Sequence, residues 1–175
     1  MTNQSLDKII NNYFKASVSE IVSTLIPYPY KLTFKMSQRG NGLHYRLGYT
    51  NTEVFSRFMY VEDSKTLIRI YGTPDKLDYK TATVHELKTT KNGISKDRLA
   101  RAKAQLTLYI WLTNMIRGSL DIYHWGTGEL EVGYIVLENN QSVKEHVEYL
   151  VRNYVAKKIA EEDAKASYIK EVLSW

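Results

Sequence analysis

The succession of strand-like and helix-like segments constrains the fold more than any other feature of the chain. Aromatic and β-branched residues are concentrated in short runs that predict strands over residues 54–61, 66–71, 83–89, 120–125 and 130–137. Turn residues separate these runs, at Asp63-Ser64, Asn92-Gly93 and Gly126-Thr127-Gly128. We expect loops around Gly40 and Gly42 and over residues 72–78.

Apolar residues at helical spacing predict three helices around these strands. The helices cover residues 5–25, about 97–117 and about 142–175. Their candidate N-caps are Ser5, Ser95 or Asp97, and Ser142. The order helix, three strands, helix, two strands, helix indicates an α/β or α+β fold in which helices flank a sheet.

The chain of 175 residues contains no internal repeat and no linker-like tract, so we expect a single domain over residues 1–175. No stretch approaches the ~20 consecutive apolar residues of a membrane span, and we expect no membrane association. The first ten residues lack the pattern of a signal peptide, which predicts an intracellular, cytoplasmic protein.

The composition narrows the chemistry of any site. The chain has no cysteine, which excludes disulfides, thiolate zinc sites, iron–sulfur clusters and a cysteine nucleophile. A bound metal would need oxygen or imidazole ligands, and such ligands favour Mg²⁺ or Mn²⁺. The formal net charge of +5 fits a polyanionic partner such as nucleic acid.

A carboxylate and an acidic-x-Lys triplet form the most informative pattern. Gly72-Thr73-Pro74-Asp75 is followed, after ten residues, by Glu86-Leu87-Lys88. Acidic-x-Lys triplets occur four times in the chain, but this one lies inside a predicted strand. Side chains at i and i+2 of a strand share a face, so Glu86 and Lys88 point the same way and His85 and Leu87 the other way. An antiparallel return of the chain would bring Asp75 beside Glu86.

Two carboxylates and an ammonium on one face indicate a metal-dependent hydrolase. Neighbouring carboxylates repel each other unless a divalent cation neutralises them. Phosphodiester hydrolysis uses such a cation to polarise the phosphoryl oxygen and to activate water, and a lysine to stabilise the developing charge. The structural alternative is a surface hairpin whose Glu86–Lys88 pair lies in solvent.

Two further features lie upstream and downstream of this pattern. Gln105 and Tyr109 are four residues apart, so both side chains lie on one face of the predicted helix. His44 supplies a neutral imidazole, which is a suitable third ligand for Mn²⁺. The alternatives are an ordinary amphipathic helix and a hydrogen-bonded structural histidine.

The order His44, Gly72-x-x-Asp75, Glu86-x-Lys88, Gln105-x-x-x-Tyr109 resembles the PD-(D/E)XK nuclease superfamily. Within it, the pattern is similar to the RecB-like nucleases and the CRISPR-adaptation exonucleases, over residues 40–112. The resemblance implies a restriction-endonuclease-like fold, a central mixed β-sheet flanked by helices. Many CRISPR-adaptation members and some helicase-linked relatives hold an iron–sulfur cluster on four cysteines, so this cysteine-free chain resembles a cluster-free relative.

The resemblance also implies a role for each matching residue. The implied metal ligands are His44, Asp75, Glu86 and the backbone carbonyl of Leu87. The implied catalytic residues are Asp75, Glu86, Lys88, Gln105 and Tyr109. Lys88 would be the catalytic lysine, and Gln105 and Tyr109 would orient it or contact DNA.

Basic residues that follow the triplet predict a path for DNA. They are Lys91, Lys96, Arg98, Arg101 and Lys103, with Asp97 the one acid among them. Lysine and arginine contacts to phosphates bind without sequence preference, whereas the structural alternative is a solvated helix start.

The favoured function is an Mg²⁺- or Mn²⁺-dependent deoxyribonuclease, an exonuclease or a flap or single-strand cutter. The alternatives are a dimeric junction resolvase or restriction-type endonuclease, and a non-catalytic nucleic-acid-binding module of the same fold. DNA is the expected partner, and a homo-oligomer or a protein partner stays open.

Overall fold

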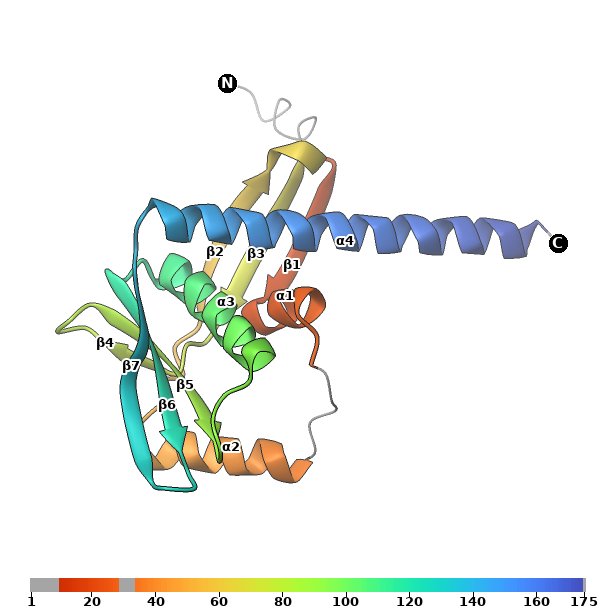
Figure 1. The fold of residues 1–175 in the computed structure, drawn as a ribbon. Coiled ribbons are helices and arrows are strands. Elements are labelled where there is room, and N and C mark those ends of the chain that lie inside the picture. The colour runs from red at the N-terminus through yellow and green to blue at the C-terminus, as the bar shows by residue number, and fades with distance from the viewer. Residues whose placement is uncertain (1–9, 29–33, 175) are drawn as a thin grey trace.

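The structure of the protein is a computed structural model that describes residues 10–28 and 34–174. Its strands form two mixed sheets (Figure 1). The first has the order β1-β3-β2 and comprises β1 (Asn12–Ser17), β3 (Thr66–Gly72) and β2 (Phe55–Val61). The second has the order β4-β5-β6-β7 and comprises β4 (Lys76–Asp78), β5 (Thr83–Thr90), β6 (Arg117–His124) and β7 (Glu129–Glu138).

Helices cover these sheets, so the predicted α/β class with sheet and flanking helices is confirmed (Figure 1). The helices are α1 (Val18–Leu25), α2 (Phe34–Arg46), α3 (Lys96–Thr113) and α4 (Gln141–Leu173), and a short 3₁₀ turn, η2 (Glu62–Ser64), joins β2 to β3. The expected single sheet is divided in two, because β3 pairs with β1 and β2 while β5 pairs with β4 and β6. No helix in the part of the chain that the structure describes has the length and apolarity needed to cross a membrane.

The first predicted helix is wrong for residues 12–17. This segment is strand β1, which pairs in parallel with β3 and alternates between the buried Phe14 and Ala16 and the outward Tyr13 and Lys15. The helix itself is only α1, whose N-cap Ser17 accepts a hydrogen bond from the Glu20 backbone N–H. The expected N-cap Ser5 lies outside the described residues.

The loop expected around Gly40 and Gly42 is also wrong, because both glycines lie within helix α2. His44 is therefore presented from the last turn of a helix. Smaller differences concern the element ends: α3 ends at Thr113 and β6 already begins at Arg117. Ser95 is the N-cap of α3, whereas Asn140 rather than Ser142 caps α4.

Helix α3 lies at the centre of the core, where it packs against both sheets and against α1 and α4. Its residues 106–110 are all buried. Gly118 on β6 allows this close approach, because a Cβ there would lie 2.7 Å from Ile110 Cδ1 and 2.8 Å from Leu106 Cδ1. The second sheet therefore lies against the face of α3 that carries Leu106 and Ile110, whereas Tyr109 lies against Gly72 at the end of β3.

Candidate active site

Asp75, Glu86 and Lys88 converge at an open edge of strand β5. Pairing with the short β4 stops at His85, so beyond that residue this edge of β5 has no strand partner among the residues that the structure describes. The Leu87 N–H donates instead to Asp75 Oδ2, at 2.8 Å. Lys88 Nζ lies 2.7 Å from Glu86 Oε1, as the two-residue alternation of a strand predicts. The chain return between β4 and β5 thus brings both carboxylates to one place.

Burial and mutual repulsion control the charge of this group. Glu86 is only 4% exposed, and burial, together with the negative charge of Asp75, raises its pKa to about 7 even though Lys88 opposes the shift. Burial favours a higher pKa for Asp75 too, but the hydrogen bond from His44 and the charge of Lys88 hold that pKa below its usual value. Burial works against the ammonium of Lys88, yet the two carboxylates raise its pKa. Lys88 is therefore charged at neutral pH.

His44 faces Asp75 from helix α2. Its Nδ1 lies 2.7 Å from the Gly40 carbonyl oxygen, and its Nε2 lies 3.3 Å from Asp75 Oδ2. A carbonyl oxygen can only accept, so Nδ1 carries the proton and a neutral His44 turns the Nε2 lone pair toward the carboxylate. This contact is favourable only with a proton or another cation between the two groups. The pKa of His44 is accordingly raised, with burial opposing and Asp75 favouring the protonated form.

Gln105 and Tyr109 reach the same region from α3. Tyr109 is buried, and burial together with the charges of Glu86 and Asp75 raises the pKa of its phenol. Gln105 lines a small cavity of about 30 Å³ with Tyr28, Lys88, Arg98 and Arg101. The spacing of the two residues therefore places one beside the carboxylates and the other beside the lysine.

The basic residues after β5 divide into two groups. Arg101 is buried: its guanidinium donates to the Ile26 carbonyl and, at 3.1 Å, to Ser23 Oγ, and it stacks 3.5 Å from the centre of the Tyr28 ring. These contacts fasten the end of α1 to α3. Arg98 similarly donates to the carbonyl of Thr89, at 2.8 Å.

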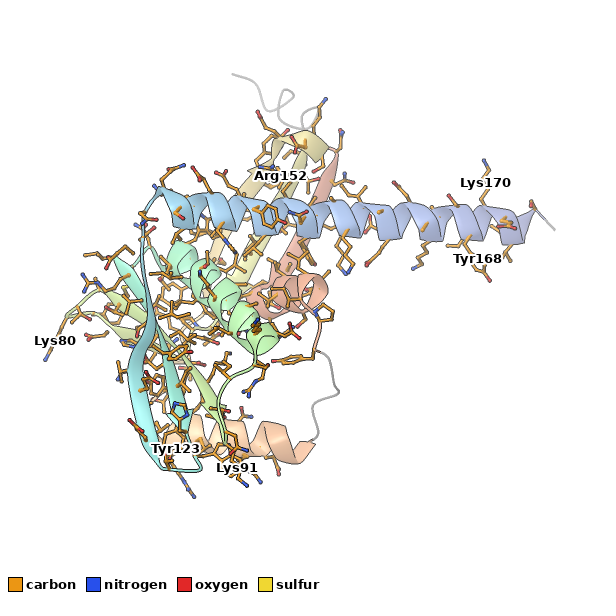
Figure 2. The ribbon with its side chains drawn as sticks, in the orientation of Figure 1. Lys80, Lys91, Tyr123, Arg152, Tyr168 and Lys170 are labelled. Carbon is orange, nitrogen blue, oxygen red and sulfur yellow. The ribbon has the colours of Figure 1, made fainter. Side chains whose placement is uncertain are left out.

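The lysines of this run are solvent-exposed and lie on different sides of the molecule. Lys103 lies near His146 on α4. Burial lowers the pKa of His146, and the charge of Lys103 lowers it further. Lys96 is exposed at the start of α3. Lys91 follows β5 and places its ammonium 5.4 Å from the centre of the Trp125 ring, near α2 (Figure 2).

Two features of the site region did not emerge from the sequence. The first is Trp125, which has the guanidinium of Arg39 4.8 Å from its ring centre in addition to Lys91. Its backbone N–H donates to the Thr90 carbonyl, at 2.9 Å, which places the indole about three residues, or ~10 Å, along the sheet from Lys88. A single tryptophan at the end of the strand predicted over residues 120–125 gave no signal of this arrangement.

The second is a buried carboxylate, Asp121, on the opposite face of the sheet from Glu86. Asp121 is fully buried and accepts from four groups, which are Tyr49 Oη at 2.6 Å, His85 Nδ1 at 2.8 Å, Ser119 Oγ at 2.6 Å and the Gly133 N–H at 2.9 Å. Burial by itself raises the pKa of Asp121. The hydrogen bonds outweigh this effect and hold the pKa below its usual value. An acid between Leu120 and Ile122 was the available signal, since a buried charge needs partners.

The Asp121 network is connected to Asp75 through two residues of the chain. Tyr49 is two positions before Asn51, whose backbone N–H donates to the Asp75 carbonyl at 3.1 Å. The Asn51 side chain donates to the Pro74 carbonyl at 2.9 Å. The backbone of Pro74 and Asp75 is therefore held by hydrogen bonds on one side, and the Asp75 carboxylate by Leu87 and His44 on the other.

The donor chemistry of the site fits a divalent cation. The described hydrogen bonds use Oδ2 of Asp75 and Oε1 of Glu86, so each carboxylate keeps its other oxygen for a ligand. A histidine that donates Nδ1–H to a backbone carbonyl has the orientation of a metal ligand. In residues 10–28 and 34–174, however, no three carboxylate or imidazole side chains are gathered as a ready-made cage. The fit therefore rests on the donor types and hydrogen-bonded orientations of Asp75, Glu86 and His44, and not on a preformed cage.

Comparison with known proteins defines the fold. No protein-family model and no curated protein sequence matches the chain. The fold is similar to the crystal structure of SSO0001, with a TM-score of 0.58 and 19% identity over 81% of this chain and 75% of that one.

It is also similar to the alkaline exonuclease LHK-Exo from Laribacter hongkongensis, with a TM-score of 0.53 and 14% identity over 98% of this chain and all of that one. The complex of LHK-Exo with dAMP gives a TM-score of 0.54 at the same identity and coverage. The chain therefore shares the α/β fold of these proteins, with mixed sheets flanked by helices, and this agrees with the predicted fold class.

Proposed function

We propose that the protein is a metal-dependent DNA nuclease that hydrolyses phosphodiester bonds at Asp75, Glu86 and Lys88. The observation that carries this proposal is the convergence of these three side chains at an open strand edge, with His44 Nε2 directed at Asp75. A surface hairpin would leave the Glu86–Lys88 pair in solvent, but Glu86 is buried. The shared fold with an alkaline exonuclease supports the same chemistry.

Asp75, Glu86 and His44 would hold Mg²⁺ or Mn²⁺, which supplies Lewis-acid polarisation of the phosphoryl oxygen when bound. The carbonyl of Leu87 is a suitable further ligand. The N–H and C=O of one strand residue leave the strand on the same side, and the Leu87 N–H already points to Asp75. The ligand set is thus fixed by one strand, one loop and one helix.

Lys88 would stabilise the charge that develops on the phosphate. Its pKa is raised by Glu86 and Asp75, so it carries a proton at neutral pH and acts as a donor rather than as a base. Gln105 lies beside Lys88 in the same small cavity and would orient its ammonium. Tyr109 would fill the space behind Glu86 and exclude water from it.

We further propose an exonuclease or single-strand specificity, because the fold is shared with an exonuclease that has been crystallised with dAMP. Lys91, Lys96 and the Arg39–Trp125 pair would contact phosphates near the site. Arg98 and Arg101 would support the DNA path indirectly, since both already bind backbone carbonyls of the protein.

The test of catalysis is Lys88→Ala, with Lys80→Ala as the matched control. Lys80 is exposed in the turn before β5, beyond the opposite end of that strand from Lys91 (Figure 2). Loss of a contact made to the transition state costs about 10²–10³ in rate. We expect this loss for Lys88→Ala in single-turnover cleavage of labelled DNA, with Mn²⁺ binding retained, and no loss for Lys80→Ala.

Metal dependence is tested separately by Asp75→Asn. This variant should lose the Mn²⁺-induced rise in melting temperature that the parent shows. Undiminished cleavage by the parent in excess EDTA would contradict the proposal. If both the parent and Asp75→Asn bind DNA and neither cleaves it, the result would instead favour a non-catalytic nucleic-acid-binding module of the same fold.

A further inference from the structure

The outer face of the first sheet presents an unusual set of side chains. Three rows of cross-strand neighbours form it: Tyr13, Leu67 and Tyr60; Lys15, Arg69 and Phe58; Ser17, Tyr71 and Ser56. Four of these nine positions are aromatic and two are basic, and none is acidic. We call these nine residues the aromatic–basic face.

Nothing in the described part of the chain covers this face. The opposite face of the same sheet is buried, because Ala16, Ile68 and Ile70 pack in the core beneath α1, α3 and α4. Figure 1 shows α4 crossing that packed side. On the aromatic–basic face, by contrast, Tyr13 is 56% exposed and Phe58 is 58% exposed. Large aromatic side chains left in solvent on one sheet mark a binding surface.

The polar groups of the face are arranged for an anion. Arg69 lies at its centre, and its Nη2 donates to Ser56 Oγ over a long distance of 3.5 Å. Its Nε–H is buried and has no hydrogen-bond partner among the described residues. Lys15 Nζ lies 5.2 Å from the centre of the Tyr71 ring. A lysine and an arginine among exposed aromatic rings match a ligand that has both phosphates and flat bases.

We propose that the aromatic–basic face binds single-stranded nucleic acid. Bases would stack on Tyr13 and Phe58, and phosphates would be bound by Lys15 and Arg69, since sheets with exposed aromatic residues bind single strands in this way. Glu62 and Asp63 in η2 lie at one end of the face, where their negative charges repel phosphates. The bound strand therefore extends toward the other end, at Tyr71.

This inference rests on the proposed function in one respect, that the bound strand is the substrate of the same protein. Tyr71 precedes Asp75 by four residues, so the two Cα atoms are at most about 14 Å apart. A strand on the face is thus within a few nucleotides of the candidate active site. The face would select single-stranded over duplex substrate, because only unpaired bases can stack on it.

The experiment compares the double variant Tyr13→Ala/Phe58→Ala with Tyr168→Ala, which removes an equally exposed tyrosine from the far end of α4 (Figure 2). Fluorescence anisotropy with a labelled oligothymidine is recorded in EDTA, so that no cleavage occurs. Each stacking contact contributes about ten-fold to affinity. We expect the double variant to bind at least ten-fold more weakly and Tyr168→Ala to bind like the parent. Lys15→Ala should reduce the salt dependence of binding by about 0.7 in the log–log slope.

Cleavage of bis(p-nitrophenyl) phosphate separates this inference from the proposed function. This diester is too small to contact the face while it occupies the active site, so the double variant should cleave it at the parent's rate. A parent that cleaves nothing would refute the nuclease proposal, and a ten-fold loss of binding would still support the face. Equal oligothymidine affinity of parent and double variant would overturn the inference, and a parent dimer that dissociates on the same substitutions would identify the face as a protein interface instead.

Discussion

The charge of Glu86 makes a quantitative prediction about the metal-free protein. Its carboxyl group has a pKa of about 7 in the native state, against 4.5 as its ordinary value. The native state therefore binds this proton more tightly than the unfolded chain does. Between these two pH values, the native state loses stability as the pH rises. The stabilisation from the bound proton is fully lost above about pH 7. The shift corresponds to about 3 kcal/mol, since each pKa unit is worth about 1.4 kcal/mol.

Glu86→Gln removes the titrating group and should flatten this dependence. Urea unfolding in EDTA, measured at several pH values from 4.5 to 8, gives the free energy of unfolding of both proteins. We expect the parent to lose about 3 kcal/mol relative to Glu86→Gln across this range. The comparison uses the change with pH, so any constant effect of leaving Lys88 beside a neutral amide cancels.

Added Mn²⁺ should reverse the loss at pH 8 in the parent and have no such effect on Glu86→Gln, because the cation takes the place of the proton. Glu171→Gln, which changes an exposed carboxylate on α4, serves as the control and should follow the parent. Parallel curves for the parent and Glu86→Gln would refute the reasoning, since they would mean that burial does not perturb Glu86.

Three further predictions concern the packing around the site. Gly118→Ala should lower stability by about 1–3 kcal/mol in urea unfolding, because its Cβ would overlap Ile110 and Leu106; an unchanged midpoint would show that α3 can move away. Tyr49→Phe should cost about 1–3 kcal/mol by removing one donor from the buried Asp121, and equal stability would mean that water or another donor replaces it. Arg101→Ala should lower the melting temperature whereas Lys103→Ala should not, because Arg101, unlike Lys103, hydrogen-bonds to residues at the end of α1. A loss of DNA affinity without loss of stability would instead assign Arg101 to the DNA path.

Strands β5, β6 and β7 of the second sheet could be predicted because they carry strong local signals, whereas the short β4 lies in the loop expected over residues 72–78. Glu86 and Lys88 share a face of β5 for the simple reason that strand side chains alternate, and the hydrogen-bonded pair has the expected geometry. The convergence of Asp75 on the same edge followed from the antiparallel return alone. The fold class emerged from the order of such segments, although the division into two sheets did not.

Strand β1 and helix α2 show where local patterns fail. The apolar residues of 5–25 fit helical spacing, but Phe14 and Ala16 also fit alternation, and the free edge of β3 decides between the two. Helix α2 contains Gly40 and Gly42, each of which costs about 1 kcal/mol in a helix interior. Its contacts to residues that flank the second sheet, from His44 to Asp75 and from Arg39 to Trp125, oppose that cost and cannot be recognised in the sequence.

Helix α4 has one more consequence, for the way the molecule unfolds. Its buried side chains end at Val155, and residues 160–174 are all exposed, so the helix extends about 20 Å beyond its last core contact (Figure 1). A helical segment of this length is marginal in water when nothing packs against it. Its backbone amides should exchange with solvent through local fraying, whereas those near Val147 and Val151 should exchange only when the whole core opens. The cooperative folding unit therefore ends near Ile159, within the helix.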